Sequence, residues 1–378
     1  MNAKDIFRKT HLFLGLASGI IIFIVSVTGA VYVFNEEIKH ITEGFRRVEP
    51  ENKPIIQPSE AFAIAKKVNA EKHIHGLVYG KNDEAVEVIF YEEEPEFYAS
   101  AFLNPYSGEV LKYRHNYKTF FGLVFKGHVA LWLPPEIGTP VIKVAVIIFL
   151  ILIITGLILW WPRKNQSTGS YGFSPGASSS VFRLELHKVV GFYVLWFALI
   201  LVFTGMIWLF KSFEKGVYQA LGGEKEITFS YPESNASKKG TIPPDKEPVD
   251  AVWEKIRTQY PEMEFIEIHA AETPESPVFV EINRDPSTYW KMDFLFFDQY
   301  TLEEITPAHA YGKFDEAGLA EKARRLNYDV HTGAIWGIPG KILAFIVSIF
   351  CASLPVTGFI LWWARQQEKK KFLRQLEF

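Results

Sequence analysis

Four apolar stretches that contain no charged residue are the feature that most constrains the fold of this chain. Each is long enough to cross about 30 Å of hydrocarbon as a helix that rises about 1.5 Å per residue. The stretches are Leu12–Phe34, Val144–Trp161, Val189–Phe210 and Ile342–Trp363. A mean hydropathy above zero, with 32 Phe, 16 Tyr and 10 Trp, indicates the same class of protein. We therefore predict an all-α four-helix bundle in a membrane.

The distribution of basic residues predicts the orientation of the bundle. Lysine and arginine gather before the first stretch, between the second and the third, and after the fourth. Because cytoplasmic loops are rich in these residues, both termini and the short middle link are expected in the cytoplasm of a bacterium, and the two long polar segments in its periplasm. The protein is then a multi-pass protein of the inner membrane. The first stretch is long and continues into VYVFNEEIKH, so we expect a retained anchor rather than a cleaved signal peptide.

Spans and polar segments alternate along the chain. Each polar segment combines a helical pattern, such as SEAFAIAKKV or VDAVWEKIRTQY, with strand patterns, which is typical of a small α+β module. The predicted segments are 1–34 (cytoplasmic N-terminus and first span), 35–138 (first periplasmic module), 139–162 (second span), 163–186 (cytoplasmic link), 187–210 (third span), 211–340 (second periplasmic module), 341–363 (fourth span) and 364–378 (cytoplasmic tail). We expect the two modules to pack together outside the membrane.

Charge and cysteine content exclude several classes of function. A formal net charge of -3 gives no electrostatic support for nucleic-acid binding, so the lipid bilayer is the first partner that the composition predicts. The single Cys351 excludes a disulfide framework, a cysteine-based zinc site and a cysteine-ligated iron–sulfur cluster within one chain. Any metal chemistry therefore uses histidine or carboxylate. The sequence contains no glycine-rich phosphate loop, HExxH motif or nucleophile elbow, and no catalytic side chain is predicted.

Two polar markers recur across the four stretches: a histidine, and a threonine followed by glycine, which we call a Thr-Gly pair. The markers are His11 with Thr28-Gly29, His187 with Thr204-Gly205, His128 with Thr155-Gly156, and His331 with Thr357-Gly358. The number of residues from the histidine to its threonine is the same in the first two markers and differs by one between the last two. The second and fourth stretches also end alike, in TGLILWWPR and TGFILWWAR. We therefore predict an internal duplication of a unit made of span, module and span.

The recurring histidines predict where the chemistry takes place. His11 and His187 begin the outward-running spans at the cytoplasmic face, whereas His128 and His331 precede the inward-running spans at the periplasmic face. Two histidines on facing helices can ligate one haem iron from both sides, and six-coordinate iron without an open position suits electron transfer. We predict two b-type haems, one for each pair. The interval from His11 to Thr28 rises about 25 Å in a helix, which leaves a gap short enough for tunnelling between haem edges.

Other polar residues have supporting roles in this interpretation. Glycines near the histidines would let a flat macrocycle approach the backbone, and the threonines are expected to hydrogen-bond within the bundle rather than bind substrate. His73 and His75 alternate along a predicted strand and can in principle bind a metal, although surface histidines on a soluble module are the simpler interpretation. Four arginines on the predicted cytoplasmic side are expected to pair with haem propionates: Arg8, Arg163, Arg183 and Arg365.

The spans and their flanks also resemble a known family. The segments RKTHLFLGLASGIIIFIVSVTG, GHVALWLPPEIG, LELHKVVGFYVLWFALILVFTG and HTGAIWGIPGK resemble the PepSY-associated transmembrane family, which includes bacterial ferric-siderophore reductases. The resemblance covers essentially the whole chain. It implies four spans with PepSY-like periplasmic modules, in which FLNPYSGEVL looks like the turn and last strand of such a module and FFDQYTLEEI like a weaker version. It also implies that His11, His128, His187 and His331 are the haem ligands of an oxidoreductase.

The resemblance implies a ferric siderophore or another ferric chelate as the periplasmic acceptor, since reduction to Fe(II) weakens binding by hard oxygen ligands. Some relatives carry a fused cytoplasmic flavin and nicotinamide reductase, whereas this chain ends soon after its last span. A separate cytoplasmic flavoprotein reductase or a quinol is therefore expected as the donor. Two alternatives stay open. One is a haem protein that reduces copper or a periplasmic partner protein, and the other is a non-redox protein whose modules bind a peptide or peptidase while the histidines are merely interfacial.

Overall fold

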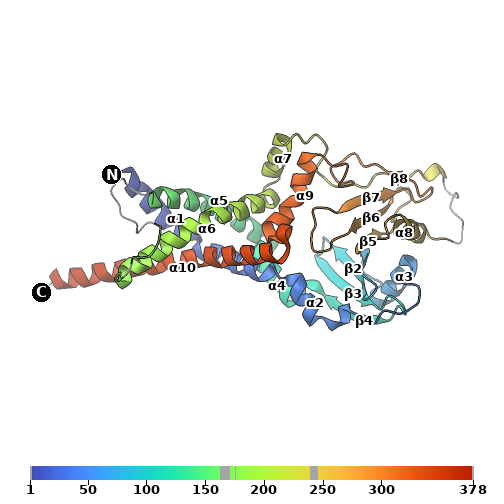
Figure 1. Cartoon of the computed structure of the whole chain (residues 1–378), viewed down its shortest axis with the longest axis horizontal. Helices are drawn as coiled ribbons and strands as arrows, with labels where there is room; N and C mark the ends of the chain where they lie inside the picture. The colour runs from blue at the N-terminus through green and yellow to red at the C-terminus, as the bar shows by residue number, and fades with distance from the viewer. Residues whose placement is uncertain (1, 162–170, 175, 239–245, 377–378) are drawn as a thin grey trace. The chain divides into compact units, whose positions relative to one another are not determined.

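The chain divides into two compact units, whose helices and strands are labelled in Figure 1. The computed structural model describes residues 2–161, 171–174, 176–238 and 246–376. Met1–Asn35, Phe120–Glu214 and Val330–Phe378 form a helical unit, and Glu36–Thr119 and Lys215–Asp329 form a sheet unit. The helical unit therefore includes residues 120–138 and 330–340, which the hydropathy pattern had grouped with the polar segments.

Four long helices make up most of the helical unit. They are α1 (Ala3–Tyr32), α5 (Pro135–Trp160), α6 (Ser179–Leu209) and α10 (Gly337–Leu376). Each is long and apolar enough to cross a membrane, so the prediction of a multi-pass membrane protein is confirmed. Each begins several residues before its charge-free stretch, because polar residues can continue a helix beyond the hydrocarbon layer.

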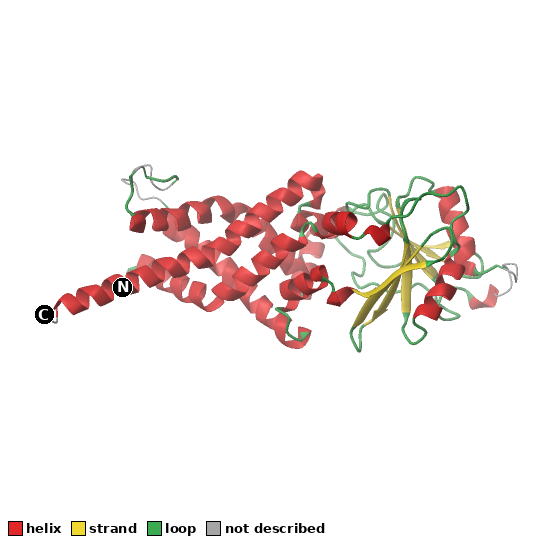
Figure 2. Ribbon diagram, turned by 90° about the horizontal axis from the view of Figure 1, so that it is seen from below, coloured by secondary structure: helices red, strands yellow, loops and turns green. Residues whose placement is uncertain are grey.

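The long helices pack side by side, as Figures 1 and 2 show. α1 contacts α5 and α10, and α6 contacts the same two helices. Buried side chains between them include Ile153, Val202 and Cys351. Phe13 and Ile20 on α1 are mostly exposed, which is expected of apolar side chains that face lipid. The predicted four-helix arrangement is therefore present.

Short helices precede two of the long ones. α4 (Phe120–Ala130) comes before α5, and α9 (Leu319–Thr332) comes before α10. The first break lies at Leu131 and Trp132, which have positive φ, and is followed by Pro134 at the N-cap of α5. The second break contains Gly333 and Gly337, both also at positive φ. Two further short helices follow long ones: α2 (Asn35–Thr42) after α1 and α7 (Lys211–Ala220) after α6.

The sheet unit contains one antiparallel sheet of eight strands in the order β4-β3-β2-β1-β5-β6-β7-β8. The strands are β1 (Ile74–Tyr79), β2 (Val86–Glu92), β3 (Phe97–Leu103), β4 (Val110–His115), β5 (Phe265–His269), β6 (Val278–Asn283), β7 (Asp293–Phe297) and β8 (Glu304–Ile305). β1 pairs with β5, so the two polar segments share a single sheet rather than forming two separate modules. The two α+β modules that were expected to pack together are therefore joined through one continuous sheet.

One face of the sheet is covered by α3 (Pro58–Val68) and α8 (Pro248–Gln259), which Figure 1 labels beside the strands. Each helix starts with proline in its first turn, where the missing N–H costs no hydrogen bond. The core beneath them takes alternate residues of each strand, such as Val88 and Phe90 of β2. Tyr79 and Trp253 pack with ring centres 4.1 Å apart and link the two halves of this core.

The two halves of the chain repeat the same order of elements. From α1 to α5 and from α6 to α10, a long helix and a short helix are followed by a helix and four strands, then by a short helix and a long helix. This order agrees with the predicted duplication, which stays a prediction.

Candidate functional site

The structure brings the four recurring histidines together as two pairs. The ring centres of His11 on α1 and His187 on α6 lie 6.4 Å apart, and the rings are nearly perpendicular. The ring centres of His128 on α4 and His331 on α9 are also 6.4 Å apart. These are the two pairings that the marker arithmetic and the orientation of the spans predicted.

In the first pair, each imidazole is held by the Thr-Gly pair of a neighbouring helix. Nδ1 of His11 lies 2.9 Å from Oγ1 of Thr155 on α5. Nδ1 of His187 lies 2.8 Å from Oγ1 of Thr357 on α10. The two contacts occupy equivalent places in the two halves of the chain.

The second pair repeats this arrangement with the other two threonines. Nδ1 of His331 lies 2.8 Å from Oγ1 of Thr204 on α6. Nδ1 of His128 donates to the carbonyl of Val25, 2.9 Å away, and lies 3.4 Å from Oγ1 of Thr28 on α1. α1 and α6 therefore each supply a histidine to one pair and a Thr-Gly pair to the other.

The threonine hydrogen bonds determine which imidazole nitrogen carries the proton. Each hydroxyl donates to the carbonyl one turn earlier in its own helix, over distances of 2.7, 2.8, 2.7 and 3.0 Å: Thr28 to Ile24, Thr155 to Ile151, Thr204 to Ile200, and Thr357 to Ser353. Since a hydroxyl has only one proton, its oxygen can only accept from the imidazole. Nδ1 is therefore the donor in all four rings, and Nε2 keeps its lone pair. Within the described residues no hydrogen-bond partner contacts these Nε2 atoms.

The glycine of each Thr-Gly pair leaves room for the imidazole ring. A Cβ built at Gly29 would lie 2.9 Å from Cε1 of His128, closer than real side chains approach. The other three glycines would place a Cβ 3.3 to 3.4 Å from Cε1 of the histidine beside them: Gly156, Gly205 and Gly358. Each Thr-Gly pair therefore contacts one histidine, whose ring the threonine orients and the glycine accommodates.

These residues fit bis-histidine ligation of a haem iron. Two imidazoles that each bound one metal ion through Nε2, over about 2.0 Å, would have ring centres roughly 6 Å apart. The observed separation is 6.4 Å in both pairs. A neutral imidazole whose Nδ1 is hydrogen-bonded and whose Nε2 is free is the form that ligates metals.

A cavity of about 600 Å³ lies at the first pair and is lined by all four long helices. This volume falls in the range of sites for small molecules and cofactors, about 300 to 1,000 Å³. His11 and His187 project into it among leucine, phenylalanine and tryptophan side chains. The glycines that line it are Gly15, Gly156, Gly191 and Gly358.

The four arginines predicted as propionate partners have different surroundings. Arg8 and Arg365 line the cavity, and Arg8 also pairs with Asp5 over 3.0 Å. Arg183 donates to Ser180 and is not part of the cavity lining. Arg163 lies outside the described residues. The structure thus brings two of the four arginines to the first histidine pair.

The threonines hydrogen-bond within the bundle, as expected, and their partners include the four histidines. The glycines, expected to admit a macrocycle, lie against the histidine rings themselves. The signal was present in the nearly constant interval between the markers. This interval alone did not reveal the contacts, because each Thr-Gly pair contacts a histidine on another helix.

Comparison with protein families extends over nearly the whole molecule. Residues 8–365 match the family described as PepSY-associated TM region. The matched range includes all four histidines, all four Thr-Gly pairs and every strand of the sheet. Comparison with curated proteins gives no match. The chain therefore belongs to the PepSY-associated TM region family.

Proposed function

We propose that this protein binds two b-type haems and carries electrons across a bacterial inner membrane. His11 and His187 would hold one haem, and His128 and His331 the other. The observation that carries the proposal is the shared state of the four imidazoles: each is paired with a second histidine, and each has a bonded Nδ1 and a free Nε2. Histidines that merely sit at a membrane interface would have no reason to share this arrangement.

The residues of the chain position both histidine pairs and insulate the first. The threonine oxygens fix the orientation of each ring, and the apolar lining of the cavity excludes water. Arg8 and Arg365 offer positive charge to propionates at the first pair. Bound between two histidines, a low-spin haem supplies one-electron redox chemistry without an open coordination position. α1 and α6 place the two pairs at opposite ends, about 25 Å of helix apart.

The orientation of the protein is part of the proposal. The lysines and arginines that flank the spans support cytoplasmic termini, a cytoplasmic link between α5 and α6, and a sheet unit in the periplasm. The repeated order of elements supports an origin by internal duplication. The first histidine pair would then face the donor, a cytoplasmic flavoprotein reductase or a quinol.

As the acceptor we propose a ferric siderophore or another ferric chelate in the periplasm. One electron from the donor reduces one Fe(III) to Fe(II), and hard oxygen ligands hold Fe(II) more weakly, so the iron is released. The resemblance to a family that includes ferric-siderophore reductases supports this acceptor, and the protein would then be a haem-dependent oxidoreductase.

Absorption spectra of histidine variants test the haem sites. The detergent-purified full chain is compared, oxidised and dithionite-reduced, with His11→Ala, His331→Ala and the control His40→Ala, whose side chain is exposed on α2. We expect low-spin b-type bands in the wild type and the control, and about half of this absorbance in each of the two other variants, since each removes a ligand of one haem. A colourless wild-type protein after haem-replete expression would contradict the proposal and favour the non-redox alternative.

Reoxidation of the reduced protein tests the acceptor. Dithionite-reduced protein is mixed anaerobically with a ferric siderophore, with the redox-inert gallium(III) form of the same siderophore, and with Cu(II). We expect rapid reoxidation by the ferric form, release of Fe(II) to a ferrous chelator, and no reaction with gallium. Reoxidation by Cu(II) but by no ferric siderophore would exclude the proposed acceptor while leaving the haem sites intact.

A further inference from the structure

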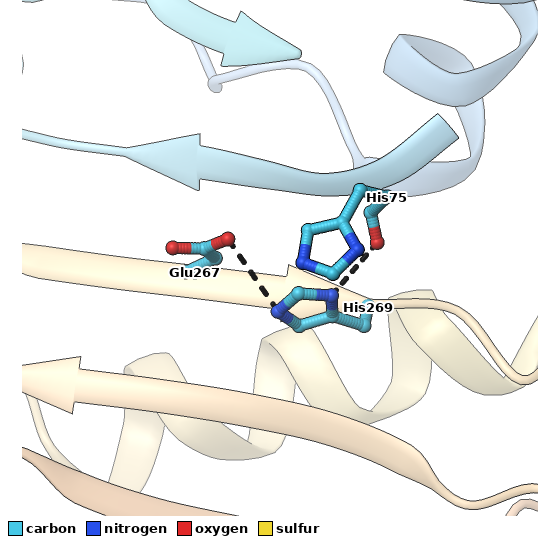
Figure 3. Close-up of side chains that lie close together, drawn as sticks. All are labelled: His75, Glu267 and His269. Carbon is cyan, nitrogen blue, oxygen red and sulfur yellow. Dashed lines mark hydrogen bonds and ion pairs between the residues drawn. The ribbon is translucent and has the colours of Figure 1, made fainter. Parts of the chain in front are cut away.

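The sheet unit contains a second cluster of metal-ligating side chains, shown in Figure 3. His75 on β1 and Glu267 and His269 on β5 place one potential ligand atom each within 4.8 Å of one another. β1 and β5 are the strands through which the two halves of the sheet pair. The cluster therefore joins two segments of the chain that are far apart in sequence.

A β-bulge brings His75 to this cluster. The pairing of β1 with β2 shifts between Ile74, opposite Phe90, and Gly76, opposite Ile89, which leaves His75 as the extra residue. Without the bulge, strict alternation would turn His75 toward the same face as Leu77, into the core under α3. A bulge reverses this alternation and often re-aims a side chain next to a functional site.

His73, which the strand pattern had grouped with His75, makes different contacts. Its Nε2 lies 2.7 Å from a carboxylate oxygen of Glu272, and its ring is exposed. β1 begins only at Ile74, so His73 lies outside the strand. The ring of His73 still lies beside that of His75, with ring centres 6.5 Å apart, and His269 is a second and closer neighbour of His75, with ring centres 4.8 Å apart.

His269 has one satisfied nitrogen and one unsatisfied nitrogen. The residue is 5% exposed, and its Nδ1 donates to the backbone carbonyl of His75 over 2.7 Å. Because Nδ1 carries the proton, Nε2 has a lone pair, yet this buried atom has no hydrogen-bond partner within the described residues. The nearest carboxylate oxygen, Oε1 of Glu267, lies 3.5 Å away. Burial is the main reason that the pKa of His269 is lowered to about 4, so the ring is neutral.

A second buried histidine of the same unit shows what a purely structural histidine contacts. Nε2 of His309 donates to the carbonyl of Ser230 over 2.7 Å, and its Nδ1 accepts from the backbone N–H of Tyr311 over 3.1 Å. Both ring nitrogens are therefore satisfied. His269 differs from His309 only on the side that faces His75 and Glu267, which is the side where a ligand would bind.

The ring of His269 is held in place by its other neighbours. It stacks on Phe279 with ring centres 4.9 Å apart and meets the edge of His75 at 4.8 Å. Gly76 lies opposite, and a Cβ there would come within 2.9 Å of Cε1 and Nδ1 of His269. A rigid, neutral imidazole with a free Nε2 is a preorganised metal ligand.

The carboxylate of the cluster lacks a basic partner. Glu267 lies directly opposite Glu281 on β6, and like charges in this position repel one another. Within the described residues neither of the two forms an ion pair with lysine or arginine. A bound cation would relieve this repulsion.

We propose that His75, His269 and Glu267 bind one divalent first-row transition metal ion, such as Zn(II), Fe(II) or Cu(II). Two imidazoles and one carboxylate suit these ions, whereas Mg(II) and Ca(II) prefer oxygen ligands alone. Bonds of about 2.1 Å require ligand atoms about 3.4 Å apart. His75 and Glu267 are partly exposed and can close this gap by rotating, while His269 stays fixed. The ion would link β1 to β5, and the proposal does not depend on haem.

Zinc binding to the untagged full chain in detergent tests this site. The chelator-treated protein is titrated with Zn(II) by calorimetry, and bound zinc is counted by mass spectrometry after desalting. We expect one ion per chain in the wild type and in His40→Ala, a control that removes an exposed histidine on α2. His75→Ala and Glu267→Gln should weaken binding by more than about 100-fold, since even loss of an outer-shell partner costs about 10- to 100-fold. Mg(II) should not compete.

The Gly76→Ala variant tests whether His269 binds the metal or only packs against its neighbours. It removes no ligand, but its methyl group would push the ring of His269 aside, so we expect about 10-fold weaker zinc binding. Circular dichroism checks the fold of every variant, and zinc should raise the thermal midpoint of the wild type but not of His75→Ala. Absence of zinc from the wild type, or equal affinity in His75→Ala and Glu267→Gln, would overturn the proposal.

Discussion

The role of each histidine depends on what its two ring nitrogens contact. Both ring nitrogens of His309 are hydrogen-bonded, so its role is structural. In each of the four bundle histidines, Nδ1 is hydrogen-bonded and Nε2 is free. The four rings lie in two pairs. A bonded Nδ1 fixes the tautomer and the orientation of the ring, which a metal ligand needs and an interfacial histidine does not.

Replacing Thr155 by valine tests the role of threonine as a positioning residue. Valine has nearly the same shape but cannot accept the Nδ1 proton of His11. We expect haem at the first pair to bind about 10- to 100-fold more weakly. Its midpoint potential should rise, because a hydrogen-bonded imidazole is the stronger donor to Fe(III). Spectroelectrochemical titration measures both effects. Thr42→Val, at a threonine that bonds only within α2, is the control, and an unchanged potential in Thr155→Val would contradict the role.

Replacing Gly29 by alanine should affect the second pair alone. The added Cβ would lie 2.9 Å from Cε1 of His128, while alanine is itself a better helix former than glycine. We expect the haem of His128 and His331 to be lost and the other to be retained, measured by haem content and by reduced spectra. Gly216→Ala on α7, where no atom lies within 4 Å of the added Cβ, is the matched control. Full haem content in Gly29→Ala would show that this glycine is not required.

At the scale of helices and strands, the apolar composition predicted the four spans, and the sequence placed the helical and strand patterns of both polar segments. It did not predict that β1 pairs with β5, because pairing between distant strands leaves no local pattern. Nor did it predict the bulge at His75, since a single extra residue looks like ordinary alternation. The histidine pairs were predictable because the sequence repeats the spacing of the two markers, whereas the contacts of the Thr-Gly pairs depend on how the helices pack.

The shared sheet predicts that the two polar segments unfold together. Trp253 on α8 is buried and stacks on Tyr79 of β1. We expect Trp253→Ala to lower the free energy of unfolding of the sheet unit by about 3 to 5 kcal/mol. Limited proteolysis with mass spectrometry should then find new cleavage in residues 36–119 as well as in 215–329. Thr258→Ala on the exposed side of α8 is the control. Cleavage confined to 215–329 in Trp253→Ala would mean that the halves fold independently.

At the scale of the whole molecule, each half of the chain repeats the same order of helices and strands. Each half also supplies one histidine to each pair, so neither half alone could complete a bis-histidine site. If the repeat arose by duplication, the ancestral unit would have needed a second copy of itself to ligate haem. This requirement gives a physical reason for the two halves to be joined in one chain.

The proposed orientation makes the sheet unit and the C-terminal tail accessible from opposite sides of the membrane. In a Cys351→Ser background, a cysteine at exposed Lys53 should react with a membrane-impermeant maleimide in intact spheroplasts. A cysteine at exposed Lys370 should react only after lysis. This pattern follows from the excess of basic residues beside the termini. Labelling of Lys370→Cys in intact spheroplasts would reverse the orientation and with it the direction of electron transfer.

The central claim is that two histidine pairs hold two haems, and counting haem per chain tests it most directly. The full chain is expressed with sufficient haem, purified in detergent, and its haem content is determined by pyridine haemochrome against quantitative amino-acid analysis. We predict two b-type haems per chain, both low-spin, because each pair offers two free Nε2 atoms. These atoms belong to rings whose centres lie 6.4 Å apart. A protein without haem, or with a single high-spin haem, would contradict the account.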